Sequence, residues 1–167
     1  MSPDPVRGDV ETVPDGPEYD LDFREHPERY RHTPDEQGAF KIEPYKSELL
    51  PRWTVSDLDG AREAAAAIHG RFEDYRESGD FVGMDLARKY LQMGWTRALR
   101  YAKYPGGKKY ERDADGNRVE REPQQWYDEE KYEISQVYRE YLDRVREDET
   151  YQQRKDRHRE RYGEDEE

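Results

Sequence analysis

The chain has 167 residues, of which 41 are acidic and 29 are basic, so its formal net charge at pH 7 is −12. It contains no cysteine, which excludes disulfide bonds, a thiol nucleophile and a cysteine-ligated metal. No stretch is apolar enough to act as a signal peptide or to cross a bilayer, so we expect a single-domain cytoplasmic protein without a membrane partner.

Two biases in the composition indicate the salt environment in which the protein works and the residue types that form its core. Arg accounts for 21 of the 29 basic residues and Lys for only 8. Excess carboxylate with little lysine keeps a protein hydrated at high salt, so we interpret the acidity as halophilic, an ordinary acidic mesophile protein being the alternative. The 14 Tyr and 3 Trp indicate a core of aromatic rings packed on alanine-lined helix faces.

The N-terminal part is expected to have little regular structure. Residues 1–38 hold six prolines among many acids, a mixture that interrupts helices and offers little to bury, so we predict a mostly disordered arm. Residues 28–31 are the part of this arm expected to dock onto the domain. Alternating apolar and polar residues from Ala39 to Ile42 predict a short strand, and Trp53 is a candidate core anchor.

Two helices follow according to the spacing of apolar residues. The first is predicted from Ser56 to Glu77, with Ser56 and Asp59 as a capping pair. Asp80 is expected to cap the second, which ends at Pro105-Gly106-Gly107. The sequence Asp115-Gly116-Asn117 then predicts an exposed hairpin or a loop.

A third helix is predicted from Trp126 to Glu147. Its inward stripe would consist of Glu130, Ile134, Tyr138, Tyr141 and Val145. Beyond Thr150 the dense charges predict a solvated helix that fades into disorder. The expected fold is therefore mainly α, with a three-helix core, a short N-terminal strand and a small hairpin between helices two and three. The expected division is an arm (1–38), one helical domain (39–148) and a charged tail (149–167).

The clearest functional signal is a basic segment, Arg88 to Arg112. It contains eight basic residues and one acid, so it carries +7, which leaves −19 for the remaining 142 residues. On a helix, Lys89, Met93, Arg97, Arg100 and Tyr104 would form one stripe pointing away from the apolar face.

Cations beside flat aromatic side chains suit the phosphates and bases of nucleic acid, and single strands or RNA fit better than duplex DNA. The candidate binding residues are Lys89, Arg97, Arg100, Tyr101, Lys103, Tyr104, Lys108 and Lys109. The alternative is that these cations pair with acids of the arm or the third helix and only stabilise the domain. A further alternative is a protein partner or an oligomer whose acids meet these cations; the oligomeric state is not predicted.

Other chemistries have weaker support. The sequence Gly107-Lys108-Lys109 lacks the remainder of a phosphate-binding loop, and Asp113 to Asn117 lacks the later ligands of a calcium loop. We assign no catalytic residue, metal or cofactor. An enzyme acting on a phosphorylated substrate remains an alternative, and its site would combine Tyr45, Lys46, Asp85 and Arg88.

Three pieces of the chain resemble one known family. They are Glu43 to Trp53, Asp80 to Lys89 and Gln92 to Arg97, and they are similar to signature sequences of the family called domain of unknown function 4385. The resemblance covers about Gly38 to Tyr110, with a looser match through the third helix. It implies a small cytoplasmic protein of bacteria, archaea or phages without an assigned reaction. The arm before Asp35 and the tail after Thr150 are expected to be peculiar to this chain.

Overall fold

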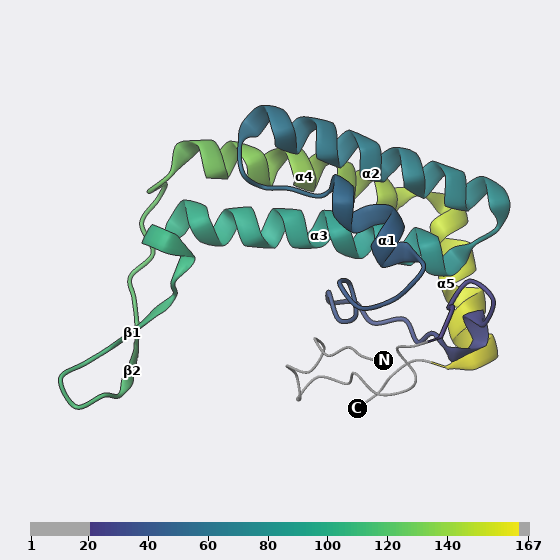
Figure 1. Cartoon of the computed structure of the whole chain (residues 1–167), viewed down its shortest axis with the longest axis horizontal. Coiled ribbons are helices and arrows are strands. Elements are labelled where there is room, and N and C mark those ends of the chain that lie inside the picture. Colours follow the sequence, from purple (N-terminus) through teal and green to yellow (C-terminus); the bar gives the residue numbers. More distant parts are fainter. Residues whose placement is uncertain (1–20, 164–167) are drawn as a thin grey trace.

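The computed structural model describes residues 21–163, in which three long helices run side by side (Figure 1). The α-helices are α1 (Tyr45–Leu49), α2 (Leu58–Ser78), α3 (Phe81–Lys103), α4 (Glu129–Glu147) and α5 (Glu149–Tyr162). Short 3-10 helices span Pro27–Arg29, Leu50–Arg52 and Pro105–Gly107, and strands β1 (Tyr110–Arg112) and β2 (Arg118–Glu120) form the one described sheet. Within these residues no helix is both long and apolar enough to cross a membrane.

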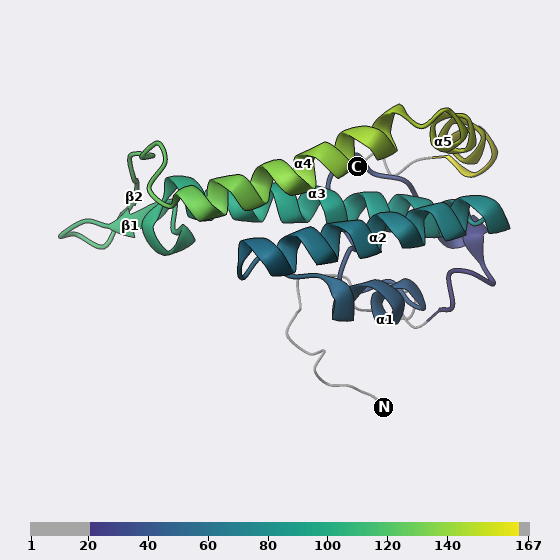
Figure 2. The same cartoon turned by 90° about the horizontal axis from the view of Figure 1, so that it is seen from above.

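The expectation of a mainly helical fold is confirmed, and so is the hairpin between the second and third long helices. The expected three-helix core is not what the structure contains. The core also includes buried side chains from α1, from α5 and from the segment that precedes α1. Of these shorter pieces, α5 lies across one end of the long helices and α1 lies along their flank (Figure 2).

Aspartates begin all four of the longer helices. Each carboxylate accepts a hydrogen bond from a backbone N–H three residues later, which satisfies a donor that the first turn leaves free. The caps are Asp57, Asp80, Asp128 and Asp148. The predicted cap at Asp80 is confirmed, whereas the predicted Ser56–Asp59 pair is wrong because Asp57 occupies the capping position of α2.

Helix α3 lies at the centre of the fold. Every residue from Phe81 to Gly94 is buried, including the charged ones. The helices approach closely where α3 has glycine: a Cβ built on Gly94 would lie 2.4 Å from ring atoms of Tyr138 on α4. A Cβ on Gly83 would lie 2.5 Å from the ring of Tyr75 on α2. Glycine at these two positions lets a tyrosine ring lie flat against the α3 backbone.

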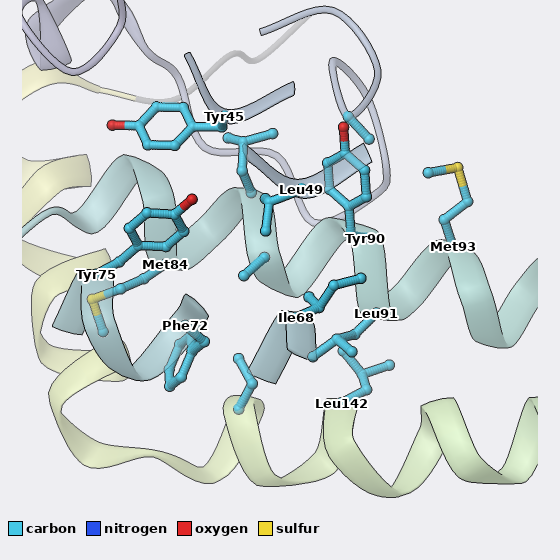
Figure 3. Packing of buried hydrophobic residues seen from close by; sticks show 14 of the residues in the cluster. Tyr45, Leu49, Ile68, Phe72, Tyr75, Met84, Tyr90, Leu91, Met93 and Leu142 are labelled. Carbon is cyan, nitrogen blue, oxygen red and sulfur yellow. The ribbon is translucent and has the colours of Figure 1, made fainter. Parts of the chain in front are cut away.

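Aromatic side chains make up much of the core, as the composition predicts. Figure 3 shows Tyr45, Tyr75 and Tyr90 packed with aliphatic and Met side chains between α1, α2 and α3, with Leu142 of α4 on the other side. The ring of Tyr45 meets that of Tyr75 edge to face, with centroids 5.5 Å apart. Such ring pairs add to the free energy gained by burying apolar area.

Residues 21–38 pack against the helices rather than remaining free. Phe23 and Tyr30 are buried, and their rings meet edge to face at 6.4 Å. The first 20 residues of the predicted arm lie outside the described residues. The predicted strand from Ala39 to Ile42 is wrong: the chain forms turns there, after Gly38 with φ +84°, and the strands described in residues 21–163, β1 and β2, pair with each other.

The C-terminal part also differs from the prediction. Helix α4 begins at Glu129, and its buried stripe includes Ile134, Tyr138 and Val145, as predicted, but Leu142 replaces Tyr141 and Glu130 is exposed. Residues 151–162 belong to a packed helix, α5, which crosses the end of the long helices and buries Tyr151 and His158 (Figure 1). The last four residues of the predicted tail lie outside the described residues.

Candidate functional site

The structure divides the basic segment into two parts with different surroundings. Arg88 and Lys89 are only 3% and 1% exposed. The prediction that Lys89 points away from the core is therefore wrong. A helical wheel leaves this face of α3 open, but the segment before α1 folds over it and also buries Met93.

A buried carboxylate, Asp85, is the centre of the first part. It accepts hydrogen bonds from the hydroxyl groups of Tyr30 (2.5 Å) and Tyr151 (2.6 Å). It also contacts Nδ1 of His32 at 3.1 Å and the Nη2 of Arg88 at 2.9 Å. These partners come from the segment before α1, from α3 and from α5, so one carboxylate joins three parts of the chain.

The charge on Asp85 is stabilised where it lies. Burial alone would raise the pKa of this carboxyl, but the positive charge of Arg88 and the hydrogen bond from His32 outweigh that cost and hold its pKa well below the ordinary value. Burial raises the pKa of Tyr30 and Tyr151, with the neighbouring carboxylate acting in the same direction. The phenols therefore stay protonated and remain hydrogen-bond donors.

The rest of the Arg88 guanidinium holds the segment before α1. Nη2 donates to the carbonyl oxygen of Thr33 at 2.6 Å, and Nη1 donates to those of Pro34 (3.0 Å) and Asp35 (2.9 Å). Three consecutive carbonyl groups, none in a helix, are thereby satisfied by one side chain. The planar guanidinium of arginine has five N–H donors in fixed directions, so it can bind several carbonyl groups at once better than a lysine ammonium can.

Lys89 makes similar contacts one residue further along. Its Nζ donates to Oγ1 of Thr33 at 3.0 Å and to the carbonyl oxygen of Gln37 at 2.5 Å. Burial lowers the pKa of Lys89 to about 8. Arg88 and Lys89 thus stabilise the fold, but through Asp85 of their own helix, Thr33 and backbone carbonyl groups rather than through acids of the arm or the third helix.

The four residues of the candidate enzyme site do not form one site. The Tyr45 hydroxyl lies against the carboxylate of Asp80, at 2.7 and 2.8 Å from its oxygens, while Asp85 and Arg88 face the segment before α1. Lys46 follows Tyr45 in the short helix α1. Within residues 21–163 no group of three His, Asp or Glu side chains lies close enough together to hold a metal ion.

The second part of the basic segment is a surface at the far end of α3, which we call the distal basic surface. It comprises Arg97, Arg100, Tyr101, Lys103, Tyr104, Lys108 and Lys109, all predicted binding residues. Within residues 21–163 none of its five cations forms a salt bridge. The alternative of pairing with acids of the third helix therefore does not describe this end of α3.

Aromatic rings hold the arginine side chains of this surface. The guanidinium of Arg97 lies 5.4 Å from the ring centroid of Trp53 and 6.0 Å from that of Phe40. That of Arg100 lies 5.8 Å from the Tyr101 ring, and its Nε is buried without a hydrogen-bond partner among the described residues. Packing against rings orients a guanidinium, and any terminal N–H groups that remain exposed can then meet a partner.

The hairpin extends this end of the molecule away from the helices (Figure 1). Tyr110 is 41% exposed, and Arg118 lies over its ring at 4.3 Å. Arg121 fixes the base of the hairpin by donating to the carbonyl oxygens of Pro105 (3.1 Å) and Lys108 (2.9 Å). Lysines 108 and 109 are exposed beside it.

Sequence reasoning missed the partners of Asp85. Nothing in the periodicity of residues 21–38 places Tyr30 or His32 on α3, because the regular structure described in that segment is one short 3-10 helix, Pro27–Arg29. A signal existed for Tyr151, since Tyr151 and His158 are spaced seven residues apart in an otherwise charged stretch. That spacing puts both on one helix face.

The fold and its polar contacts define a small helical protein with a buried carboxylate network at one end and, at the other, a basic, aromatic surface whose cations form no salt bridge with the described residues. A family model described as Domain of unknown function (DUF4385) matches residues 14–161, so the chain belongs to this family. The match includes most of the arm and of α5, which corrects the expectation that these are peculiar to this chain. No curated protein and no solved structure matches the chain.

Proposed function

We propose that the chain is a cytoplasmic binding module that holds RNA or single-stranded DNA on the distal basic surface and catalyses no reaction. The observation that carries this proposal is the set of five cations without a salt bridge to any described residue, in a protein with a net charge of −12. Cations left unpaired in a strongly acidic chain favour an anionic partner.

The neighbouring rings favour a single-stranded partner. Tyr104 is half-buried and Tyr110 is exposed, and both lie next to lysines in the chain. Unpaired bases stack on such rings while phosphates meet the cations, and base stacking depends little on sequence. In duplex DNA the base faces are already stacked on one another, so tyrosine rings would add less.

We further propose that the acidic composition is halophilic, which changes the balance of contacts on this surface. The screening length falls to about 3 Å near molar salt, so long-range attraction by Lys108 and Lys109 contributes little there. Ring stacking and bidentate hydrogen bonds from Arg97 and Arg100 persist under these conditions. The arginines and tyrosines would then supply most of the affinity in concentrated salt.

Fluorescence anisotropy with a labelled short single-stranded RNA, measured over a salt series, tests this proposal. The distal variant carries both Arg97→Gln and Arg100→Gln. The control variant carries both Arg62→Gln and Arg144→Gln, which removes two cations from exposed positions on α2 and α4. Circular dichroism of each variant checks that it is folded. We expect the distal variant to bind at least about tenfold more weakly and the control to match the unchanged protein.

Two results would contradict the proposal. One is an absence of RNA and single-stranded DNA binding at every salt concentration at which the protein is folded. The other is an equal loss of affinity in the distal and control variants, which would indicate a general effect of net charge. Binding of an acidic protein instead of nucleic acid by the same surface would replace the proposal with a protein-interaction role.

A further inference from the structure

A cavity lies at the end of the molecule opposite the hairpin, between the start of α3 and the helix α5. Its volume is about 580 Å³, within the range of sites that hold small molecules. Four arginines line it: Arg24, Arg154, Arg157 and Arg161. None of the predicted site residues is among the residues that line this cavity.

The arginines of α5 share one face of that helix. Arg154, Arg157 and Arg161 are spaced by three and four residues, so they project toward the same side, which is the cavity side. At about 100° per residue Asp156 lies roughly 130° from the centre of this face and Glu160 lies at its edge, and neither acid lines the cavity. A helix that appears evenly charged in sequence therefore presents a basic face to the cavity.

The charges that line the cavity do not balance. Arg24 is neutralised, because it donates to Glu48 at 2.8 and 2.9 Å and to Asp80 at 3.0 Å. Arg157 and Arg161 form no salt bridge with any residue from 21 to 163. The cavity therefore has an excess of positive charge near its α5 wall.

The remaining polar groups of the lining do not cancel this excess. Asp80, the one acid among the lining residues, already accepts hydrogen bonds from Arg24, from the Tyr45 hydroxyl and from the N–H of Gly83. Arg154 donates to the carbonyl oxygen of Arg76 at 2.9 Å, and it forms no salt bridge with a residue of the described part of the chain. Burial lowers the pKa of His158, so the imidazole is neutral at pH 7.

We propose that this cavity binds a small molecule through a chain of two or more phosphate groups. Guanidinium groups bind phosphate oxygens in pairs of parallel hydrogen bonds, and three of them line one wall. From residue 154 to residue 161 the helix rises by about 10 Å, which exceeds the width of a single phosphate. Several phosphates in a row would meet all three arginines.

Isothermal titration calorimetry of the full chain with inorganic triphosphate tests the assignment. The variant is Arg157→Gln with Arg161→Gln, both of which are exposed residues outside the core. The control is again Arg62→Gln with Arg144→Gln, which makes the same change in net charge elsewhere. We expect the unchanged protein and the control to bind alike, and the cavity variant to bind about tenfold or more weakly.

Two further titrations separate the sources of the phosphate chain. Inorganic monophosphate should bind much more weakly than triphosphate, and equal affinities would overturn the proposal. ATP without metal should bind at least as tightly as triphosphate, because the phosphate chain is what the arginines contact. Binding of ATP but not of triphosphate would overturn the proposal, because recognition would then depend on the nucleoside.

The Arg97→Gln and Arg100→Gln variant separates this proposal from that of nucleic-acid binding. It should bind triphosphate as the unchanged protein does, because its substitutions lie at the other end of α3. Loss of triphosphate binding in that variant, with binding kept in the cavity variant, would place the phosphate on the distal basic surface and overturn the assignment to the cavity. No heat of binding with the unchanged protein would overturn it as well.

Discussion

The hydroxyl group of Tyr151 on α5 donates a hydrogen bond of 2.6 Å to Oδ1 of Asp85, which is buried on α3. The two residues are 66 positions apart, and the bond ties the last described helix to the central one. The ring of Tyr151 also packs on that of Phe81, with centroids 5.9 Å apart. The charged C-terminal helix is therefore part of the folded core.

Replacing this tyrosine by phenylalanine isolates the hydrogen bond. Tyr151→Phe keeps the ring but leaves the buried carboxylate with one donor fewer, so we expect the free energy of unfolding to fall by about 1–3 kcal/mol. Urea unfolding followed by circular dichroism measures the change. The control Tyr127→Phe, at a position that is 54% exposed, should change stability by less than about 0.5 kcal/mol. Equal effects of the two substitutions would contradict the role of the Asp85 bond.

Removing the charge of Asp85 should be more damaging. Asp85→Asn leaves Arg88 buried without its counter-ion, and we expect a loss of about 3–5 kcal/mol. Because the pKa of Asp85 is lower in the folded than in the unfolded chain, its contribution is complete above about pH 4 and is lost as the pH falls further. Acid titration of stability should show this loss in the unchanged protein and a smaller one in Asp85→Asn. Asp156→Asn, exposed on α5, should behave like the unchanged protein.

Lys89 should make the protein more stable as the solution becomes alkaline. Its pKa is about 8 in the folded chain and 10.5 when unperturbed, so between these values the unfolded chain binds a proton that the folded chain does not. Stability should therefore rise between pH 8 and pH 9, by at most about 1.4 kcal/mol per pH unit. From about pH 9 upward the tyrosines with raised pKa values act in the opposite direction, because the unfolded chain begins to ionise them and the folded chain does not.

The variant Lys89→Met tests this assignment, since its side chain is apolar and of similar length. Urea unfolding at pH 7, 8, 8.5 and 9, below the ionisation of the tyrosines, should show the rise in the unchanged protein and a flat profile in Lys89→Met. A rise of equal slope in both proteins would show that another group is responsible. Asp35, Asp85 and Arg88 are the charged neighbours that influence Lys89.

Two glycines in helices should respond to alanine in opposite ways. At Gly94 a Cβ would lie 2.4 Å from the Tyr138 ring, so Gly94→Ala must displace α4 or the ring and should cost about 1–3 kcal/mol. At Gly70, in α2, a Cβ meets nothing within 4 Å, so Gly70→Ala should stabilise by about 0.5–1 kcal/mol through helix propensity. Thermal unfolding of both variants checks the signs. A stabilising Gly94→Ala would show that α3 and α4 do not approach as closely as described.

The two exposed lysines at the base of the hairpin should set the salt dependence of RNA binding. Lys108→Gln with Lys109→Gln should reduce the slope of log affinity against log salt by about 1.4, because each lysine contact to a single strand releases about 0.7 of a counterion. Affinity near molar salt should change little. A slope equal to that of the unchanged protein would show that neither lysine contacts phosphate.

Much of the helical architecture could be predicted from sequence because it depends on local rules. Apolar spacing marked the three long helices, Asp80 marked the start of α3, and Asp115-Gly116-Asn117 marked the hairpin. The predicted strand at Ala39 to Ile42 failed because alternation over four residues does not show whether a pairing strand exists. The Ser56 cap failed because neighbouring residues compete for the same position, and Asp57 occupies it.

The candidate site was predicted only in part, because helical spacing does not show which face of a helix another segment covers. Helical spacing placed Arg97, Arg100 and Tyr104 on a surface away from α2 and α4, and the structure leaves the arginines there without a salt bridge to the described residues. The same spacing put Lys89 on that surface. It is buried because the segment before α1 covers the first half of α3.

Composition and local pattern were enough to establish the acidic character of the chain, the long helices, the concentration of positive charge in one segment and the resemblance to a family of unknown function. The folded structure was needed to show which of those charges are buried and which form no salt bridge with the described residues. Burial of an ion depends on neighbours that are distant in sequence, as Tyr30 and Tyr151 are from Asp85. No local pattern encodes such neighbours, and the arginine-lined cavity between α3 and α5 depends on them in the same way.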